Sequence, residues 1–107
     1  MEISNLYKER IFNKIEDACC KCASEYFNTE VDKEGLYKAR RLNLPASIAR
    51  GISLVIMHDF YAMTYTDIFK HTKMGIKSVM MRVRIVRDMI ETDSLYSNIF
   101  EKIKSRL

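Results

Sequence analysis

Residues 64–87 read Thr64-Tyr-Thr-Asp-Ile-Phe-Lys-His-Thr-Lys-Met-Gly-Ile-Lys-Ser-Val-Met-Met-Arg-Val-Arg-Ile-Val-Arg87. This stretch fits a short helix, a turn that contains glycine, and a second helix, which is the layout of a helix-turn-helix. Thr64 followed by Asp67 is typical of a capping box, so we expect the first helix to begin there. Positions 70–87 hold six lysines and arginines and no acidic residue. A second helix of this charge is typical of units that enter the major groove of DNA.

The rest of the chain also predicts helices, because apolar residues recur at helical spacing. We expect helices at about residues 4–27, 45–62, 64–72, 76–91 and 93–107, with a further helical turn between 30 and 37. The helix that opens at Pro45 is apolar on nearly all sides, which is typical of a buried central helix. The chain contains only three glycines and one proline. We therefore predict an all-α fold, with residues 1–107 forming one domain of five to six helices.

Charge is distributed unevenly along the chain. Residues 1–37 contain five basic and eight acidic residues, whereas residues 38–50 contain four basic residues and no acid. The 70–87 block adds six more positive charges. An acidic N-terminal part followed by two basic blocks indicates one surface that faces a polyanion. Considered alone, the charge also fits a solvated helix face.

The second helix of the motif supplies most of the predicted contacts. Its valines at 79, 83 and 86 mark the buried side, so Lys77, Met81 and Arg84 point outward. Lys77 and Arg84 can donate hydrogen bonds to guanine or phosphate, and Met81 can touch a thymine methyl group. The predicted DNA-contacting residues are Lys77, Ser78, Met81, Arg82 and Arg84 at the major groove, Lys73 in the turn, and Arg40, Arg41 and Arg50 on the DNA backbone.

Two features of the same helix limit this interpretation. Asp88 lies on the outward face, where it would repel phosphate, so we expect only the first two turns to enter the groove. Met81 and Ile85 are outward-facing apolar residues. They also fit a basic surface helix that packs on a protein partner.

The three cysteines, Cys19, Cys20 and Cys22, lie within one predicted helix. Neighbours in a helix have poor geometry for a disulfide, and no second ligand pair follows at zinc spacing. We therefore predict no metal site. Cys19 and Cys22 fall on the apolar side of the helix as core residues, whereas Cys20 is expected to be exposed.

The sequence contains no motif that indicates another class of function. There is no Ser/His/Asp constellation, no glycine-rich phosphate loop and no HExxH helix, so we expect no catalytic site, cofactor or small-molecule substrate. The longest mainly apolar run, 51–57, is too short to cross a membrane. No secretory signal opens the sequence. We expect a monomeric cytoplasmic protein, nucleoid-associated if it binds DNA.

Several motifs occur in the order found in one known family. They are Tyr26-Phe27 at the end of the first helix, the basic connection Lys38-Ala-Arg-Arg41, the apolar helix 45–62, and Thr64-Tyr-Thr-Asp-Ile68. Together they resemble the C-terminal, duplex-binding domain of the bacterial chromosomal replication initiator DnaA, over roughly residues 12–107. The resemblance implies a Trp-repressor-like helix-turn-helix fold and double-stranded DNA binding, as a replication- or transcription-related accessory protein. It also implies that Arg50 contacts phosphate and that Arg40 or Arg41 reaches a minor groove.

The chain departs from this family in the turn of the motif. The family's Gly-Arg-Asp-His-Thr-Thr-Val is replaced by Lys73-Met-Gly-Ile-Lys-Ser-Val79. Ser78 and Val79 match the last Thr-Val, whereas the Arg, Asp and His that help to read the initiator's DNA box have no counterpart. Base-specific readout is therefore not carried over. The alternative function is a protein–protein interaction module that kept the fold and lost specific DNA readout.

Overall fold

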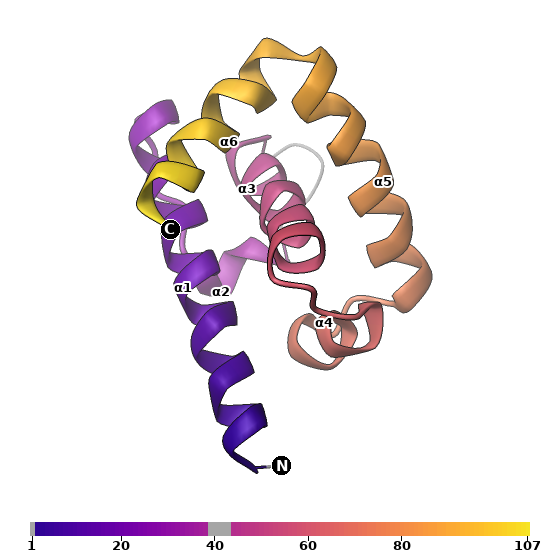
Figure 1. Cartoon of the computed structure of the whole chain (residues 1–107). Helices are drawn as coiled ribbons and strands as arrows, with labels where there is room; N and C mark the ends of the chain where they lie inside the picture. Colours follow the sequence, from indigo (N-terminus) through magenta and orange to yellow (C-terminus); the bar gives the residue numbers. More distant parts are fainter. Residues whose placement is uncertain (1, 39–43) are drawn as a thin grey trace.

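The computed structural model describes residues 2–38 and 44–107, with side chains from residue 6 onward. The elements are α1 (Glu2–Phe27), α2 (Lys33–Leu36), α3 (Leu44–Val55), the π-helix η1 (Ile56–Phe60), α4 (Tyr65–Thr72), α5 (Ile76–Thr92) and α6 (Ser94–Arg106) (Figure 1). All regular secondary structure in these ranges is helical, so the prediction of an all-α fold is confirmed. The radius of gyration, 12.9 Å, is that of one compact domain of this length. Helix α1 begins at Glu2, two residues before the start expected at about residue 4.

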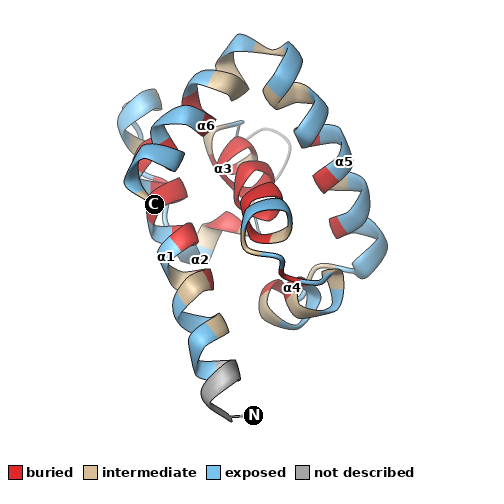
Figure 2. Ribbon diagram, viewed as in Figure 1, coloured by how far each residue is buried: buried red, intermediate tan, exposed pale blue. Residues whose placement is uncertain are grey.

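Helix α3 forms the centre of the fold, with α1, α5 and α6 packed around it (Figure 1). Residues 48–57 are all buried, and Figure 2 shows this run in red inside the ring of helices. The predicted buried central helix is thereby confirmed, with Pro45 in its first turn, where proline's missing N–H leaves no helical hydrogen bond unmade. Hydrophobic spacing did not reveal that the last part, η1, is a π-helix. The chain leaves it through Ala62, which adopts a left-handed φ of 55°.

Helix α5 packs closely on α3 at Gly51. A Cβ atom on Gly51 would lie 2.7 Å from Cγ2 of Val86, nearer than two carbon atoms can pack. Val79, Val83 and Val86 are buried against the core, as their spacing predicted, and Ile90 is half-buried. The absence of a side chain at Gly51 thus allows this valine row to lie against α3.

We expect Gly51→Ala to destabilise the protein, because the added methyl group needs space that Val86 occupies. Overpacking costs about 1–3 kcal/mol and the gain in helix propensity returns about 1 kcal/mol, which leaves a net loss of up to about 2 kcal/mol. Val86→Ala opens that space, so it should cost less in the Gly51→Ala background than in the wild type. Urea unfolding of the four chains measures this coupling. Strictly additive effects would contradict the close approach.

The cysteines of α1 correct one prediction. Cys19 and Cys22 are buried as expected, but Cys20 is buried as well, with 6% of its surface exposed. The reason lies outside α1. The segment at Asp32 and Lys33, where α2 begins, packs back on α1 closely enough for its charges to act on the Cys20 thiol. Helical spacing within α1 carries no information about that cover.

Burial also lowers the reactivity of these thiols. It raises the pKa of Cys19 and Cys22, and it raises the pKa of Cys20 to about 11, with the nearby charge of Glu16 adding to the effect. At pH 8 only about one thousandth of the Cys20 thiols would be ionised.

We therefore expect the native protein to react slowly with an aromatic disulfide reagent at pH 8, and three thiols to react at once in urea. The reagent's absorbance follows both reactions. One thiol that reacts quickly in the native protein would contradict the burial of Cys20.

Candidate nucleic-acid interface

The segment that the sequence singled out folds as α4, a short turn and α5. Helix α4 opens with the predicted capping box. The Thr64 hydroxyl accepts a hydrogen bond from the Asp67 N–H (3.0 Å), and the Asp67 carboxylate accepts one from the Thr64 N–H (3.2 Å). Lys8 of α1 lies 3.3 Å from the same carboxylate. Burial works to raise the pKa of Asp67, but the bonds from Thr64 and the Lys8 ammonium bring it below its usual value.

The turn between the two helices depends on Lys73. This residue takes the left-handed conformation (φ 65°), and its N–H donates to the Phe69 carbonyl at 2.8 Å to close α4. The Thr72 hydroxyl accepts from the Met74 N–H at 3.2 Å. Gly75, by contrast, has a φ of −56° and precedes α5 as its N-cap without a side-chain hydrogen bond. The left-handed position of the turn therefore belongs to an exposed lysine, and the glycine serves as the N-cap.

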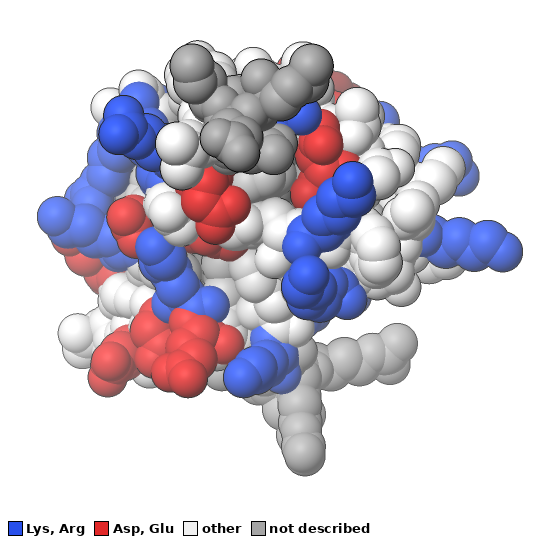
Figure 3. Space-filling view, turned by 90° about the horizontal axis from the view of Figure 1, so that it is seen from below, with Lys and Arg blue, Asp and Glu red and all other residues white. Residues whose placement is uncertain are grey.

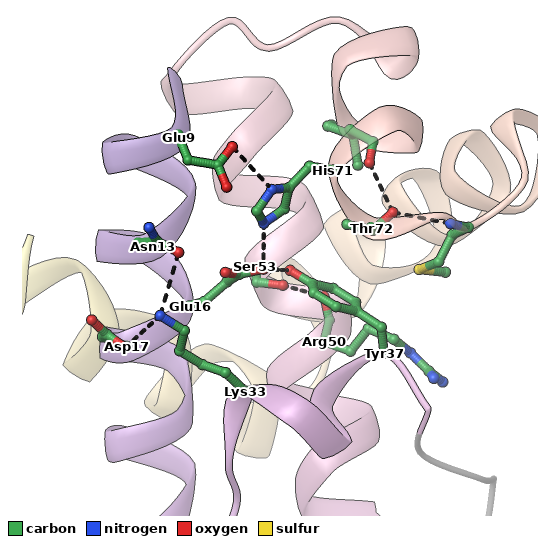
Figure 4. Close-up of polar contacts among 12 residues, drawn as sticks. Glu9, Asn13, Glu16, Asp17, Lys33, Tyr37, Arg50, Ser53, His71 and Thr72 are labelled. Atoms are coloured by element: carbon green, nitrogen blue, oxygen red, sulfur yellow. Dashed lines mark hydrogen bonds and ion pairs between the residues drawn. The ribbon is translucent and has the colours of Figure 1, made fainter. Parts of the chain in front are cut away.

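A buried polar cluster connects the end of α4 to α1 and α2 (Figure 4). The carboxylate of Glu16 is 4% exposed, and His71 Nε2 lies 2.9 Å from its Oε2 atom. The Tyr37 hydroxyl donates to the same oxygen at 2.5 Å. The imidazole ring also stacks on Phe12, with ring centroids 4.2 Å apart. Because a buried carboxylate is costly without partners, this cluster holds the α4–turn–α5 unit against α1.

Electrostatics keeps Tyr37 in its neutral, donating form. Burial, followed by the negative charge of Glu16, raises the pKa of Tyr37 well above its usual value. This cluster could not be predicted from the sequence, because Glu16 and His71 are 55 positions apart. His71 looked isolated in the sequence, and no local pattern could have connected it to Glu16.

We expect His71→Phe to destabilise the protein more than His58→Phe does. Both imidazoles stack on an aromatic ring, but His71 faces a carboxylate whereas His58 Nδ1 bonds to the Met63 carbonyl at 2.9 Å. Loss of a hydrogen bond to a charged group costs about 1.5–3 kcal/mol, and loss of one between neutral groups about 0.5–1.5 kcal/mol. Urea unfolding at pH 7 measures both. Equal costs would contradict the role of Glu16.

The outward face of α5 is as the sequence predicted. Lys77, Ser78 and Arg84 are exposed, and Met81 has 62% of its surface exposed. Lys73 is exposed in the turn just before the helix. Figure 3 shows Lys and Arg side chains at the right-hand edge, the side on which α5 lies in Figure 1, while acidic side chains gather at the lower left. Lys77 and Arg84 are seven residues apart and therefore project from the same side of α5, and Lys73 lies in the turn just before it.

The other predicted contacts are placed differently. Arg82 is half-buried and lies near enough to Arg50 for their charges to repel. Arg50 itself is only 8% exposed, because it belongs to the central helix. Burial, and then the charge of Arg82, lower the pKa of Arg50. This burial leaves little surface for the predicted phosphate contact. Arg40 and Arg41 lie outside the described residues.

The second half of α5 is neutralised by an ion pair. Nε and Nη2 of Arg87 lie 2.8 and 2.7 Å from the two carboxylate oxygens of Asp59 in η1. The bond to Asp59 raises the pKa of Arg87. Asp59 thus has a basic partner on α5. Since Asp88 is exposed one position further on, the positive charge of α5 is concentrated in its first turns.

The structure also has a second basic surface, which the sequence analysis did not predict. An open groove along α1 and the end of α6 is lined by Arg10, Lys14, Lys21 and Arg106, among others. Residues 1–37 carry a net negative charge, which concealed it. Arg10, Lys14 and Lys21 are spaced at i, i+4 and i+11, and this helical spacing was the signal that could have revealed the groove.

None of the protein-family models, curated proteins or solved structures compared with this chain matches it. Across residues 2–38 and 44–107, no helix combines the length and the apolar character needed to cross a membrane. Nor do the described side chains bring together three His, Cys, Asp or Glu residues in a way that could hold a metal ion.

Proposed function

We propose that this protein binds double-stranded DNA through a helix-turn-helix formed by α4, the turn and α5. The observation that carries the proposal is the arrangement of charge on α5. Lys77 and Arg84 are exposed on one side with Lys73 beside them, whereas Arg87 is paired with Asp59. A cationic first half and a neutralised second half suit a helix that inserts its N-terminal turns into a major groove.

Each side chain on the exposed face of α5 is suited to a different contact with DNA. Lys77 and Arg84 project from the exposed side, where each can reach guanine O6 and N7 or a phosphate. Ser78, in the first turn of α5, is suited to a phosphate contact supported by the helix N-terminus. Lys73 meets a phosphate from the turn. Arg82 serves the flank of the groove, where its charge lies close to that of Arg50.

The resemblance to the DnaA C-terminal domain supports the same proposal. On that basis the fold is a Trp-repressor-like helix-turn-helix, and the protein acts with DNA in the cytoplasm as an accessory of replication or transcription. Arg40 or Arg41 then serves as the minor-groove contact that the resemblance implies.

A second candidate function rests on a specific observation. Met81 and Ile85 are 62% and 46% exposed on the same helix face. Exposed apolar side chains at one turn's spacing also suit a surface that packs on a protein partner. On that reading the chain is an interaction module without DNA readout, and the experiment below separates the two functions.

We expect the double variant Lys77→Ala, Arg84→Ala to bind duplex DNA at least tenfold more weakly than the wild type, because two groove-facing cations are lost. Fluorescence anisotropy with random and AT-rich duplexes at several salt concentrations measures the change. The dependence of binding on salt should become shallower by up to about two units. Thermal unfolding should change little, because both side chains are exposed.

The matched control is Lys14→Ala, Lys21→Ala, which removes the same charge from the groove along α1. It should bind nearly as the wild type does. Equal losses in both double variants would contradict the α5 assignment and indicate attraction by net charge alone. No binding by the wild type even at low salt would overturn the DNA proposal in favour of a protein partner.

A further inference from the structure

The exposed face of α5 carries an apolar pair within a cationic rim. Met81 and Ile85 are spaced one helical turn apart and are 62% and 46% exposed. Lys77 and Arg84 border them on one side, and Ser78 lies on the other, all three exposed. Met81 and Ile85 therefore each lie beside a cationic side chain or a hydroxyl group.

The side chains on this face can make only a few kinds of contact with DNA bases. Between residues 76 and 87 there is no Asn, Gln, Asp or Glu. Residues 76–87 therefore lack the amide that pairs with adenine N6 and N7, and the carboxylate that accepts from cytosine N4; the first carboxylate on this face is Asp88, three residues after Ile85. It offers hydrogen-bond donors, which suit guanine and phosphate, and apolar groups. In the major groove, the one apolar group that a base pair presents is the C5 methyl of thymine.

We propose that Met81 and Ile85 recognise thymine methyl groups, so that the preferred duplex has thymines where these two side chains enter the groove. Ile85 lies in the third turn of α5, so the helix enters one turn further than the sequence alone led us to expect. This inference rests on the proposed function and deepens it. Residues four apart are about 6 Å apart along a helix, and successive base pairs are stacked about 3.4 Å apart. The pair therefore spans a run of about two to three base pairs.

The cations that surround Met81 and Ile85 argue against a protein as the partner that binds this face. A stable protein interface takes about 800 Å² from each partner and has an apolar centre depleted of charge. Here four apolar side chains of α5 are exposed, two of them, Ile76 and Met80, by only 40% and 39%. Lys77 and Arg84 stand directly beside Met81 and Ile85. A polyanion whose groove carries methyl groups complements both the cations and the apolar pair.

The test replaces thymine by uracil, which removes the methyl group and keeps every hydrogen-bonding group. A duplex selected from a random pool with the wild-type protein is made with dT or with dU at each position in turn. We expect binding to weaken about fourfold for each contacted methyl group that is lost. Fluorescence anisotropy at one salt concentration compares the series.

The protein variant completes the cycle. Met81→Ala should weaken binding to the dT duplex to the level that the wild type shows for the duplex with dU at the position Met81 contacts. The same variant should bind that dU duplex as the wild type does. Met81→Leu should retain most of the difference in affinity between the two duplexes. Leu6→Ala, which removes a 65% exposed apolar side chain from α1, should leave the preference for dT intact.

Each remaining outcome overturns the inference in a recognisable way. Equal binding of wild type to dT and dU duplexes would refute methyl recognition while the DNA-binding function stands. An equal loss on both duplexes in Met81→Ala would show that Met81 acts elsewhere. Failure of the wild type to bind any duplex would remove the proposed function together with this inference.

Discussion

Helix α5 lies against α3 at Gly51, where Val86 occupies the space that a Cβ atom on residue 51 would need. The orientation of the exposed face of α5 depends on this contact. The row of Val79, Val83 and Val86 turns inward because apolar burial is the main favourable term in folding. Since the helix has 3.6 residues per turn, fixing one side fixes the other. Lys77 and Met81 therefore face solvent as a consequence of packing on the buried central helix.

Polar contacts then fasten the α4–turn–α5 unit to the body of the protein. The Lys8–Asp67 pair and the buried Glu16–His71 contact connect α4 to α1, and the Asp59–Arg87 pair connects η1 to α5. The last of these has a further effect on charge. By neutralising a cation in the second half of α5, it leaves the positive potential on the first turns, which is the half that the proposed groove-binding geometry requires.

Much of the fold could be predicted because its signals are local. Capping residues and apolar spacing indicated α4, α5 and α6 to within a residue or two, and the all-round apolar character of residues 45–62 indicated a central helix. The exposed part of the candidate site, with Lys77, Met81 and Arg84, followed from the same spacing. Arg50 was harder to interpret, since an arginine near a helix start is usually exposed and this one lies in the core helix. The likeness to the DnaA domain stays a prediction.

The sequence by itself determined where helices form and which side of α5 turns outward, because hydrogen bonds, caps and periodicity act between residues close along the chain. Only the tertiary structure decided that Cys20 is covered by the start of α2, and that the Glu16 carboxylate meets His71. It also decided that Lys73, and not Gly75, takes the left-handed position of the turn. These outcomes depend on how segments distant along the chain approach one another, and no pattern within one helix encodes that approach.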